Sequence, residues 1–155
     1  MDLHEMRRKD REKTEQDGYD ILREVSYGIM STVSVDGTPY GVPINFVLSE
    51  NKIYFHCAHN VGHKLENLLN NPNVCFTAVS KAVVVPKEFA SDYRSVVVFG
   101  SAEEVTGNEK IKGLMLLVEK YSPDFRAEGI KYIEASADAT SVFAITISHI
   151  TAKER

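Results

Sequence analysis

The sequence predicts a mainly β domain with peripheral helices, an α+β fold with six antiparallel strands. Short runs rich in β-branched and aromatic residues recur along the chain and are separated by turn residues. Asp36 and Gly37 stand between two such runs and form a typical two-residue hairpin turn. The predicted order is helix, three strands, helix, two strands, two helices and strand. Because hairpins join most consecutive strands, this order favours an antiparallel sheet or small barrel over a doubly wound parallel sheet.

The composition is typical of one globular domain spanning residues 1–155, with 43% hydrophobic and 26% charged residues. A net charge of −4 argues against a nucleic-acid partner, since such partners usually require a basic face. No apolar run reaches the roughly 18 residues of a membrane helix, and the N-terminus lacks a signal-peptide core. Cys57 and Cys75 give no disulfide framework, so we expect free thiols and a cytoplasmic location.

In the first part of the chain, Thr14 is the predicted N-cap of a helix within a helical N-terminal extension over about residues 1–25. The apolar side of this helix is formed by Ile21, Leu22 and Val25. Strands are predicted over residues 28–35, 38–48 and 53–58. Pro39 and Pro43 remove ladder donors from the second strand, which we therefore expect to be bulged, at an edge, or open to a ligand.

The second part of the chain is predicted to supply the remaining elements. A helix over residues 62–70 presents Leu65, Leu68 and Leu69 to the core and ends at Asn71-Pro72-Asn73. Further strands are expected over residues 74–80, 93–105 and 141–150, with a helix over 108–119 and a short helix starting at Ser122-Pro123-Asp124. Residues 151–155 are interpreted as a polar tail.

The start of the helix over residues 62–70 is the strongest candidate binding site. Gly62, His63 and Lys64 open this helix, and cations are unfavourable at a helix N-terminus unless an anion lies there. Unpaired backbone N–H groups at the same position suit a phosphate group. The sequence has no GxGxxG motif and no P-loop, so a nucleoside triphosphate or a dinucleotide bound in the Rossmann manner is not expected. A charged turn that is merely solvated remains the alternative.

His56 is the main candidate for chemistry near this helix. Strand alternation puts Ile53, Phe55 and Cys57 on one face, and His56 on the other. Both a half-buried structural histidine and a cofactor contact fit this position. A zinc site is the rival interpretation, because His56, Cys57, His59 and His63 are zinc-type ligands. His56 and Cys57 point to opposite faces of one strand, so we expect no metal site.

Several motifs, taken in order, resemble those of the Nim-type 5-nitroimidazole resistance proteins, within the pyridoxamine 5′-phosphate oxidase-like flavin-binding split barrels. The similar segments cover nearly the whole chain: Met6-Arg-Arg8, Ser31-Thr-Val33, Asp36-Gly37, Pro39-Tyr-Gly-Val-Pro-Ile-Asn-Phe46, Ile53-Tyr-Phe-His-Cys-Ala58, Gly62-His-Lys-Leu65, Val84-Val-Pro86, Tyr93-Arg-Ser-Val-Val-Val-Phe-Gly100, Lys120-Tyr-Ser-Pro123, Ile145-Thr-Ile147 and His149-Ile-Thr151. This resemblance implies a six-stranded antiparallel split β-barrel of the FMN-binding type.

The resemblance also implies a homodimer with FMN at the subunit interface. The implied cofactor-binding residues are Thr32, Val42, Pro43, Ile44, Asn45, His56, Cys57, Gly62, His63 and Lys64. The implied function is an oxidoreductase that reduces small electron-poor acceptors such as nitroimidazoles, with His56 as a catalytic proton donor. The alternatives are a non-catalytic flavin or haem binder and a pyridoxamine 5′-phosphate oxidase. The chain contains no tryptophan and lacks the oxidase's C-terminal substrate segment, which weakens the last alternative.

Overall fold

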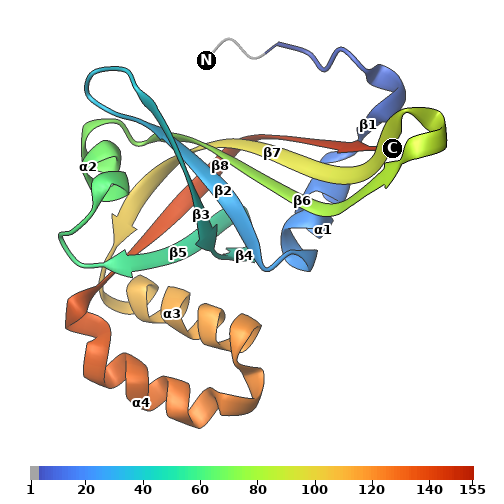
Figure 1. Cartoon of the computed structure of the whole chain (residues 1–155). Helices are drawn as coiled ribbons and strands as arrows, with labels where there is room; N and C mark the ends of the chain where they lie inside the picture. The colour runs from blue at the N-terminus through green and yellow to red at the C-terminus, as the bar shows by residue number, and fades with distance from the viewer. Residues whose placement is uncertain (1–3) are drawn as a thin grey trace.

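The protein is built on one antiparallel sheet that curls into a barrel, with helices at its ends and side (Figure 1). The computed structural model describes residues 4–155. The strands are β1 (Glu12–Lys13), β2 (Tyr27–Val33), β3 (Pro39–Asn45), β4 (Val47–Ser49), β5 (Lys52–Ala58), β6 (Asn73–Val85), β7 (Ala90–Val105) and β8 (Thr140–Glu154). The α-helices are α1 (Glu15–Glu24), α2 (His63–Asn70), α3 (Gly107–Tyr121) and α4 (Arg126–Ser136). The predicted mainly antiparallel α+β fold is confirmed.

Helix α1 begins as its sequence predicts. The Asp17 amide donates to the Thr14 hydroxyl, and the Asp17 carboxylate accepts from the Thr14 amide at 2.9 Å, which forms a capping box. Ile21 and Leu22 are buried in the barrel. A helical extension is expected over about residues 1–25, but the α-helix covers only the last part of this range. A short 3₁₀ turn (Lys9–Arg11) and strand β1 precede α1. Residues 1–3 of that extension lie outside the described part of the chain.

The predicted strand over residues 38–48 is broken at Phe46. Its first half, β3, pairs with β2 across the Asp36–Gly37 hairpin, while its second half, β4, pairs with β5. The strand order is β3-β2-β6-β7-β8-β5-β4, so the buried Phe46 joins the two ends of the sheet. Within residues 4–155, no ladder connects β3 to β5. β3 therefore has one open edge, as its two prolines predict.

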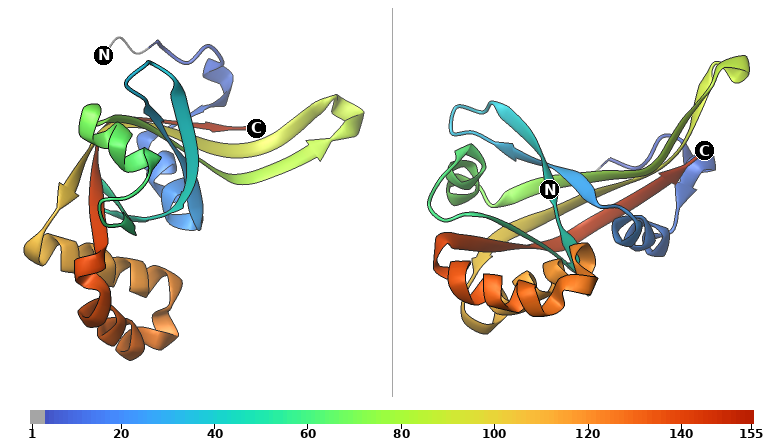
Figure 2. Two further views of the ribbon diagram at one scale, coloured as in Figure 1. Left: turned by 60° about the vertical axis from the view of Figure 1, so that its left-hand side comes forward. Right: turned by 60° about the horizontal axis from the view of Figure 1, so that its bottom comes forward.

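Strands β6, β7 and β8 are all longer than the sequence indicates. β6 and β7 continue past the rest of the sheet and together form a projecting arm (Figure 2). A 3₁₀ turn at Pro86–Glu88 joins them at its tip. The prediction of a polar tail after residue 150 is wrong, because Thr151 to Glu154 pair with β7 and in part with β1. This polar strand end looks like a tail in sequence, since Ala152 is the one side chain of these four that is fully buried.

Two clusters of buried residues make up the core. The barrel interior holds Met30, Phe46, Phe55 and Phe76, among others. A second cluster lies where α3 and α4 cover the outer face of β5 and β8, and its members include Tyr54, Leu114, Leu117, Ile133 and Val142. Leu65 and Leu68 are buried as predicted, but Leu69 is 76% exposed, so its predicted inward position is wrong. Among the four α-helices described, none has the length and hydropathy needed to cross a bilayer.

Candidate functional site

The start of helix α2 has free backbone donors. Gly62 is its N-cap with φ 113°, a conformation that favours glycine, and a Cβ at this position would meet no atom within 4 Å. No side chain caps this end, and the Gly62 carbonyl accepts from the amides of Leu65 and Glu66. The amides of His63 and Lys64 are therefore left without a partner within the described residues. This geometry is suited to an anion.

His63 has a structural role that the sequence did not indicate. Its Nε2 lies 2.9 Å from the Ser34 hydroxyl, and its ring centroid is 4.4 Å from that of Tyr40. Both contacts tie the N-terminus of α2 to the β2–β3 hairpin. His63 thus fixes the position of the helix start, while Lys64 is the cation of this turn without an ion-pair partner among residues 4–155.

A buried polar pair supports the same helix from below. The Asn67 side-chain amide donates to the Thr32 hydroxyl at 2.9 Å, and both side chains are almost completely buried. The Thr32 hydroxyl in turn lies 3.4 Å from the Tyr40 carbonyl. Thr32 therefore braces α2 against β2 and lies beneath the candidate site, where its side chain does not face solvent.

His56 and Cys57 occupy opposite faces of β5, as alternation predicts. The His56 side chain is exposed, and the pKa of its imidazole is lowered, first by partial desolvation of the ring and then by the nearby Lys64 charge. The Cys57 side chain packs in the barrel core, where burial raises the pKa of its thiol. His56 is therefore uncharged at neutral pH and faces outward, and only the backbone of Cys57 can face a ligand.

The open edge of β3 contributes the next part of the site. Val42 and Ile44 face the core, while Pro43 and Asn45 are exposed. The Asn45 side-chain amide donates to the Ser26 carbonyl at 2.9 Å, which leaves the Asn45 side-chain oxygen free to accept. Of the predicted residues, the structure thus brings Asn45 and His56 to one cavity, with Lys64 close enough to act on the His56 charge.

This cavity lies between the barrel and the α3–α4 hairpin and has a volume of about 280 Å³. Its apolar wall is formed by Leu114, Leu117, Val118 and Ile133. None of these four residues is among the predicted site residues, because their helical spacing indicates only that one face of the helix is packed against other residues. Tyr121 lines the cavity beside Asn45. It belongs to residues 120–123, one of the segments similar to the family, so that similarity was a signal for it.

The histidines near the start of α2 are the residues that a metal site in this region would need. His56, His59 and His63 do not converge: His63 contacts Ser34, while His59 Nδ1 lies 2.8 Å from the Ser141 hydroxyl. Within the described residues, no three His, Cys, Asp or Glu side chains are grouped so that they could hold an ion.

The fold and this site define an antiparallel barrel with one open edge, where an uncapped helix start, a histidine and an apolar cavity lie close together. Residues 14–154 match the family described as pyridoxamine 5′-phosphate oxidase, and the chain belongs to this family. No curated protein matches the chain significantly.

Solved structures share the fold. A candidate 5-nitroimidazole antibiotic resistance protein from Bacteroides thetaiotaomicron is 24% identical, with 91% of this chain and 84% of that chain covered and a TM-score of 0.78. An FAD and haem binding protein from Mycobacterium smegmatis is 22% identical, with 93% of this chain and 73% of that chain covered and a TM-score of 0.78. An FAD binding protein from the same organism is 22% identical, with 93% of this chain and 98% of that chain covered and a TM-score of 0.62.

Proposed function

We propose that this chain binds a flavin, specifically FMN, and acts as an oxidoreductase on small electron-poor acceptors such as nitroimidazoles. The observation that carries the proposal is the uncapped start of α2 with Lys64 in its first turn, beside the outward-facing His56. A single helix start with one free lysine suits one phosphate group. The names of two similar structures, both FAD binding proteins, support a flavin, and the name of a third, a 5-nitroimidazole resistance protein, supports a nitroimidazole as the acceptor.

The residues present fit this cofactor. The amides of His63 and Lys64, with the Lys64 ammonium, would hold the phosphate, and the open edge of β3 from Val42 to Asn45 would lie along the ring. When bound, the flavin would supply the electron-transfer chemistry. The apolar wall contributed by α3 and α4 would shield one side of the region beside Asn45 and His56 from water.

His56 is the proposed proton donor to the acceptor. The donor is its imidazolium form, which becomes neutral imidazole when it gives up the proton; because desolvation and Lys64 lower the pKa, this form is the minor one at pH 7 and increases as the pH falls. The polar groups of the cavity carry no formal charge at that pH, which favours small neutral acceptors. We also propose that the site is completed in a homodimer and that the protein acts in the cytoplasm.

The test is an absorbance spectrum of the purified protein, followed by fluorescence titration with FMN, FAD and riboflavin. FMN should bind at least tenfold more tightly than riboflavin, since a charge-assisted phosphate contact is worth about 1.5–3 kcal/mol. Equal affinity for FMN and riboflavin would reject the phosphate site, and tighter FAD binding would reject FMN as the preferred flavin. A haem spectrum without flavin binding would favour a haem carrier instead.

A further inference from the structure

The cavity between the barrel and the α3–α4 hairpin has a side that the proposed chemistry does not use. His56 and Thr140 both line this cavity. His56 pairs with Val142 across the β5–β8 ladder, and Thr140 precedes Val142 by two positions on the same face of β8. His56 and Thr140 are therefore diagonal neighbours, whose backbones are about 7–8 Å apart. One small ring bound beside His56 is thus within reach of Thr140.

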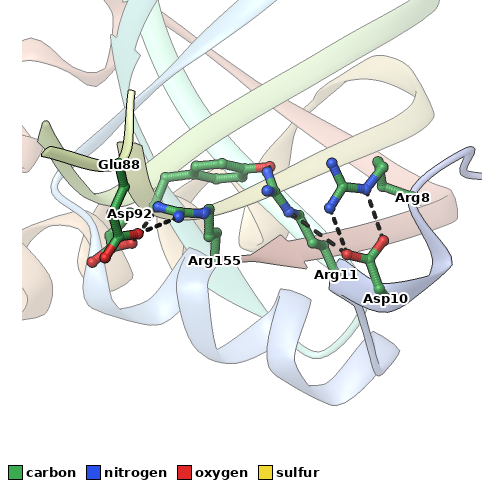
Figure 3. A network of polar contacts seen from close by, with 7 residues as sticks. Arg8, Asp10, Arg11, Glu88, Asp92 and Arg155 are labelled. Carbon is green, nitrogen blue, oxygen red and sulfur yellow. Dashed lines mark hydrogen bonds and ion pairs between the residues drawn. The ribbon is translucent and has the colours of Figure 1, made fainter. Parts of the chain in front are cut away.

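The side chains that line this cavity carry no lysine, arginine or carboxylate group within residues 4–155. Ion pairs lie instead at the other end of β8, where Arg155 donates to Asp92 at 3.0 Å and Arg8 pairs with Asp10 (Figure 3). A charged ligand would lose its hydration in the cavity without gaining a partner of opposite charge. The cavity is therefore suited to a neutral ligand.

Two hydroxyl groups beside His56 have already used their hydrogens. The Ser136 hydroxyl donates to the Tyr132 carbonyl at 2.6 Å, and the Thr140 hydroxyl donates to the Ser136 carbonyl at 3.0 Å. A hydroxyl group has one hydrogen and two lone pairs. Ser136 Oγ and Thr140 Oγ1 therefore offer lone pairs to a ligand and have no hydrogen left to donate.

Other polar groups of the cavity strengthen this bias toward acceptors. The Asn45 side-chain oxygen is free to accept, because the amide nitrogen donates to a backbone carbonyl. The Tyr121 hydroxyl is fully occupied by backbone groups. Ser122 and Tyr132 also line the cavity, and Tyr132 is 74% exposed, so water can bind its hydroxyl. The wall next to His56 therefore matches a ligand that carries a hydrogen-bond donor.

We propose that this cavity selects neutral acceptors that carry a hydroxyl or N–H group away from their reducible group. Ser136 Oγ and Thr140 Oγ1 accept a hydrogen bond from that group, while the reducible group faces His56. The class of ligand is a small nitro heterocycle with a hydroxyalkyl or amide substituent. The inference rests on the proposed function for the place of the reducible group, and it makes Ser136 and Thr140 specificity-determining residues.

The experiment compares two neutral ligands of equal size by calorimetric titration of the purified protein in excess FMN. One is a 5-nitroimidazole with a hydroxyethyl group on a ring nitrogen, and the other carries a propyl group there. The hydroxyethyl ligand should bind at least as tightly, although the propyl ligand has more apolar surface to bury. Tighter binding of the propyl ligand, or no binding of either ligand, would overturn the inference.

Removal of both oxygens tests the two residues directly. Thr140→Val combined with Ser136→Ala should lower the affinity ratio of the hydroxyethyl to the propyl ligand roughly 3- to 10-fold. Thr140→Ser keeps the oxygen and should keep the ratio. Ser148→Ala is the matched control, because the exposed Ser148 hydroxyl also donates to a backbone carbonyl, that of Phe99 at 3.0 Å, but does not line the cavity. An unchanged ratio in the double variant, or an equal loss for both ligands, would overturn the inference.

Two further measurements separate this inference from the proposed function. In turnover with a chemical reductant, the double variant should raise KM for the hydroxyethyl ligand and leave kcat unchanged, because the contact lies away from the reducible group. Fluorescence titration with FMN tests the cofactor independently. A ligand preference without FMN binding would reject the cofactor alone, and FMN-dependent turnover with an unchanged ratio in the double variant would reject the role of Ser136 and Thr140 alone.

Discussion

The hydroxyl of Tyr121 and the backbone of Phe46 are joined by two hydrogen-bond contacts, although 75 positions separate them in the chain. The Phe46 amide donates to the Tyr121 hydroxyl at 2.9 Å, and the Phe46 carbonyl lies 2.7 Å from the same oxygen. The Ser26 carbonyl is 2.6 Å away. Tyr121 thus satisfies the backbone where β3 ends and β4 begins, and it fixes Asn45, which also binds Ser26.

Tyr121→Phe should destabilise the protein by about 1–3 kcal/mol, because it leaves the Phe46 amide without a partner in a mostly buried position. Urea denaturation measures this change. Tyr132→Phe is the matched control, since Tyr132 lines the same cavity but is 74% exposed. Equal stability of the two variants would show that the contact contributes nothing measurable.

Lys64→Ala should weaken FMN binding roughly 10- to 100-fold and leave riboflavin binding nearly unchanged, because only FMN carries the phosphate. Flavin fluorescence titration measures both ligands. Lys110→Ala, at the start of α3 and away from the cavity, serves as the control. A parallel loss for both ligands would mean that Lys64 supports the ring or the fold, and not the phosphate.

His56→Asn should fold and bind FMN, while turnover with a chemical reductant and a nitroaromatic acceptor drops about 10²- to 10⁴-fold. The pH–rate profile of the wild type should have a limb below pH 6.5, because the pKa of His56 is lowered by desolvation and Lys64. The variant should lose this limb. His63→Asn is the control, because His63 holds the β2–β3 hairpin and should affect affinity more than turnover. Unchanged turnover of His56→Asn at saturating FMN would remove the catalytic assignment.

Lys120 should make stability depend on alkaline pH. Its ammonium donates to the Phe46 carbonyl at 2.8 Å, and burial lowers the pKa to about 8 from the usual 10.5. Between these two values the unfolded chain binds more protons than the folded one, so the free energy of unfolding should rise with pH across this window. Chemical denaturation from pH 7.5 to 10.5 tests this, with Lys120→Met as the variant in which the rise should flatten. If the free energy of unfolding of Lys120→Met rose with pH by the same amount, groups other than Lys120 would be responsible for the rise.

Local sequence was sufficient to predict the elements whose shape depends on near neighbours. The capping box of Thr14 and Asp17, the Asp36–Gly37 turn and the glycine start of α2 all form as expected, because each depends on contacts within a few residues. The alternation of His56 and Cys57 across β5 follows from strand geometry in the same way.

Only the tertiary structure showed the break at Phe46, the added pairing of residues 151–154 and the exposure of Leu69, because each depends on a partner distant in the chain. The same reason explains the site. The sequence indicated a helix start and a histidine, but it gave no reason to place Tyr121, Leu114 and Ile133 beside Asn45 and His56. Helical spacing shows that a face is buried, whereas the surface that buries it is chosen by the packing of α3 and α4 on the barrel.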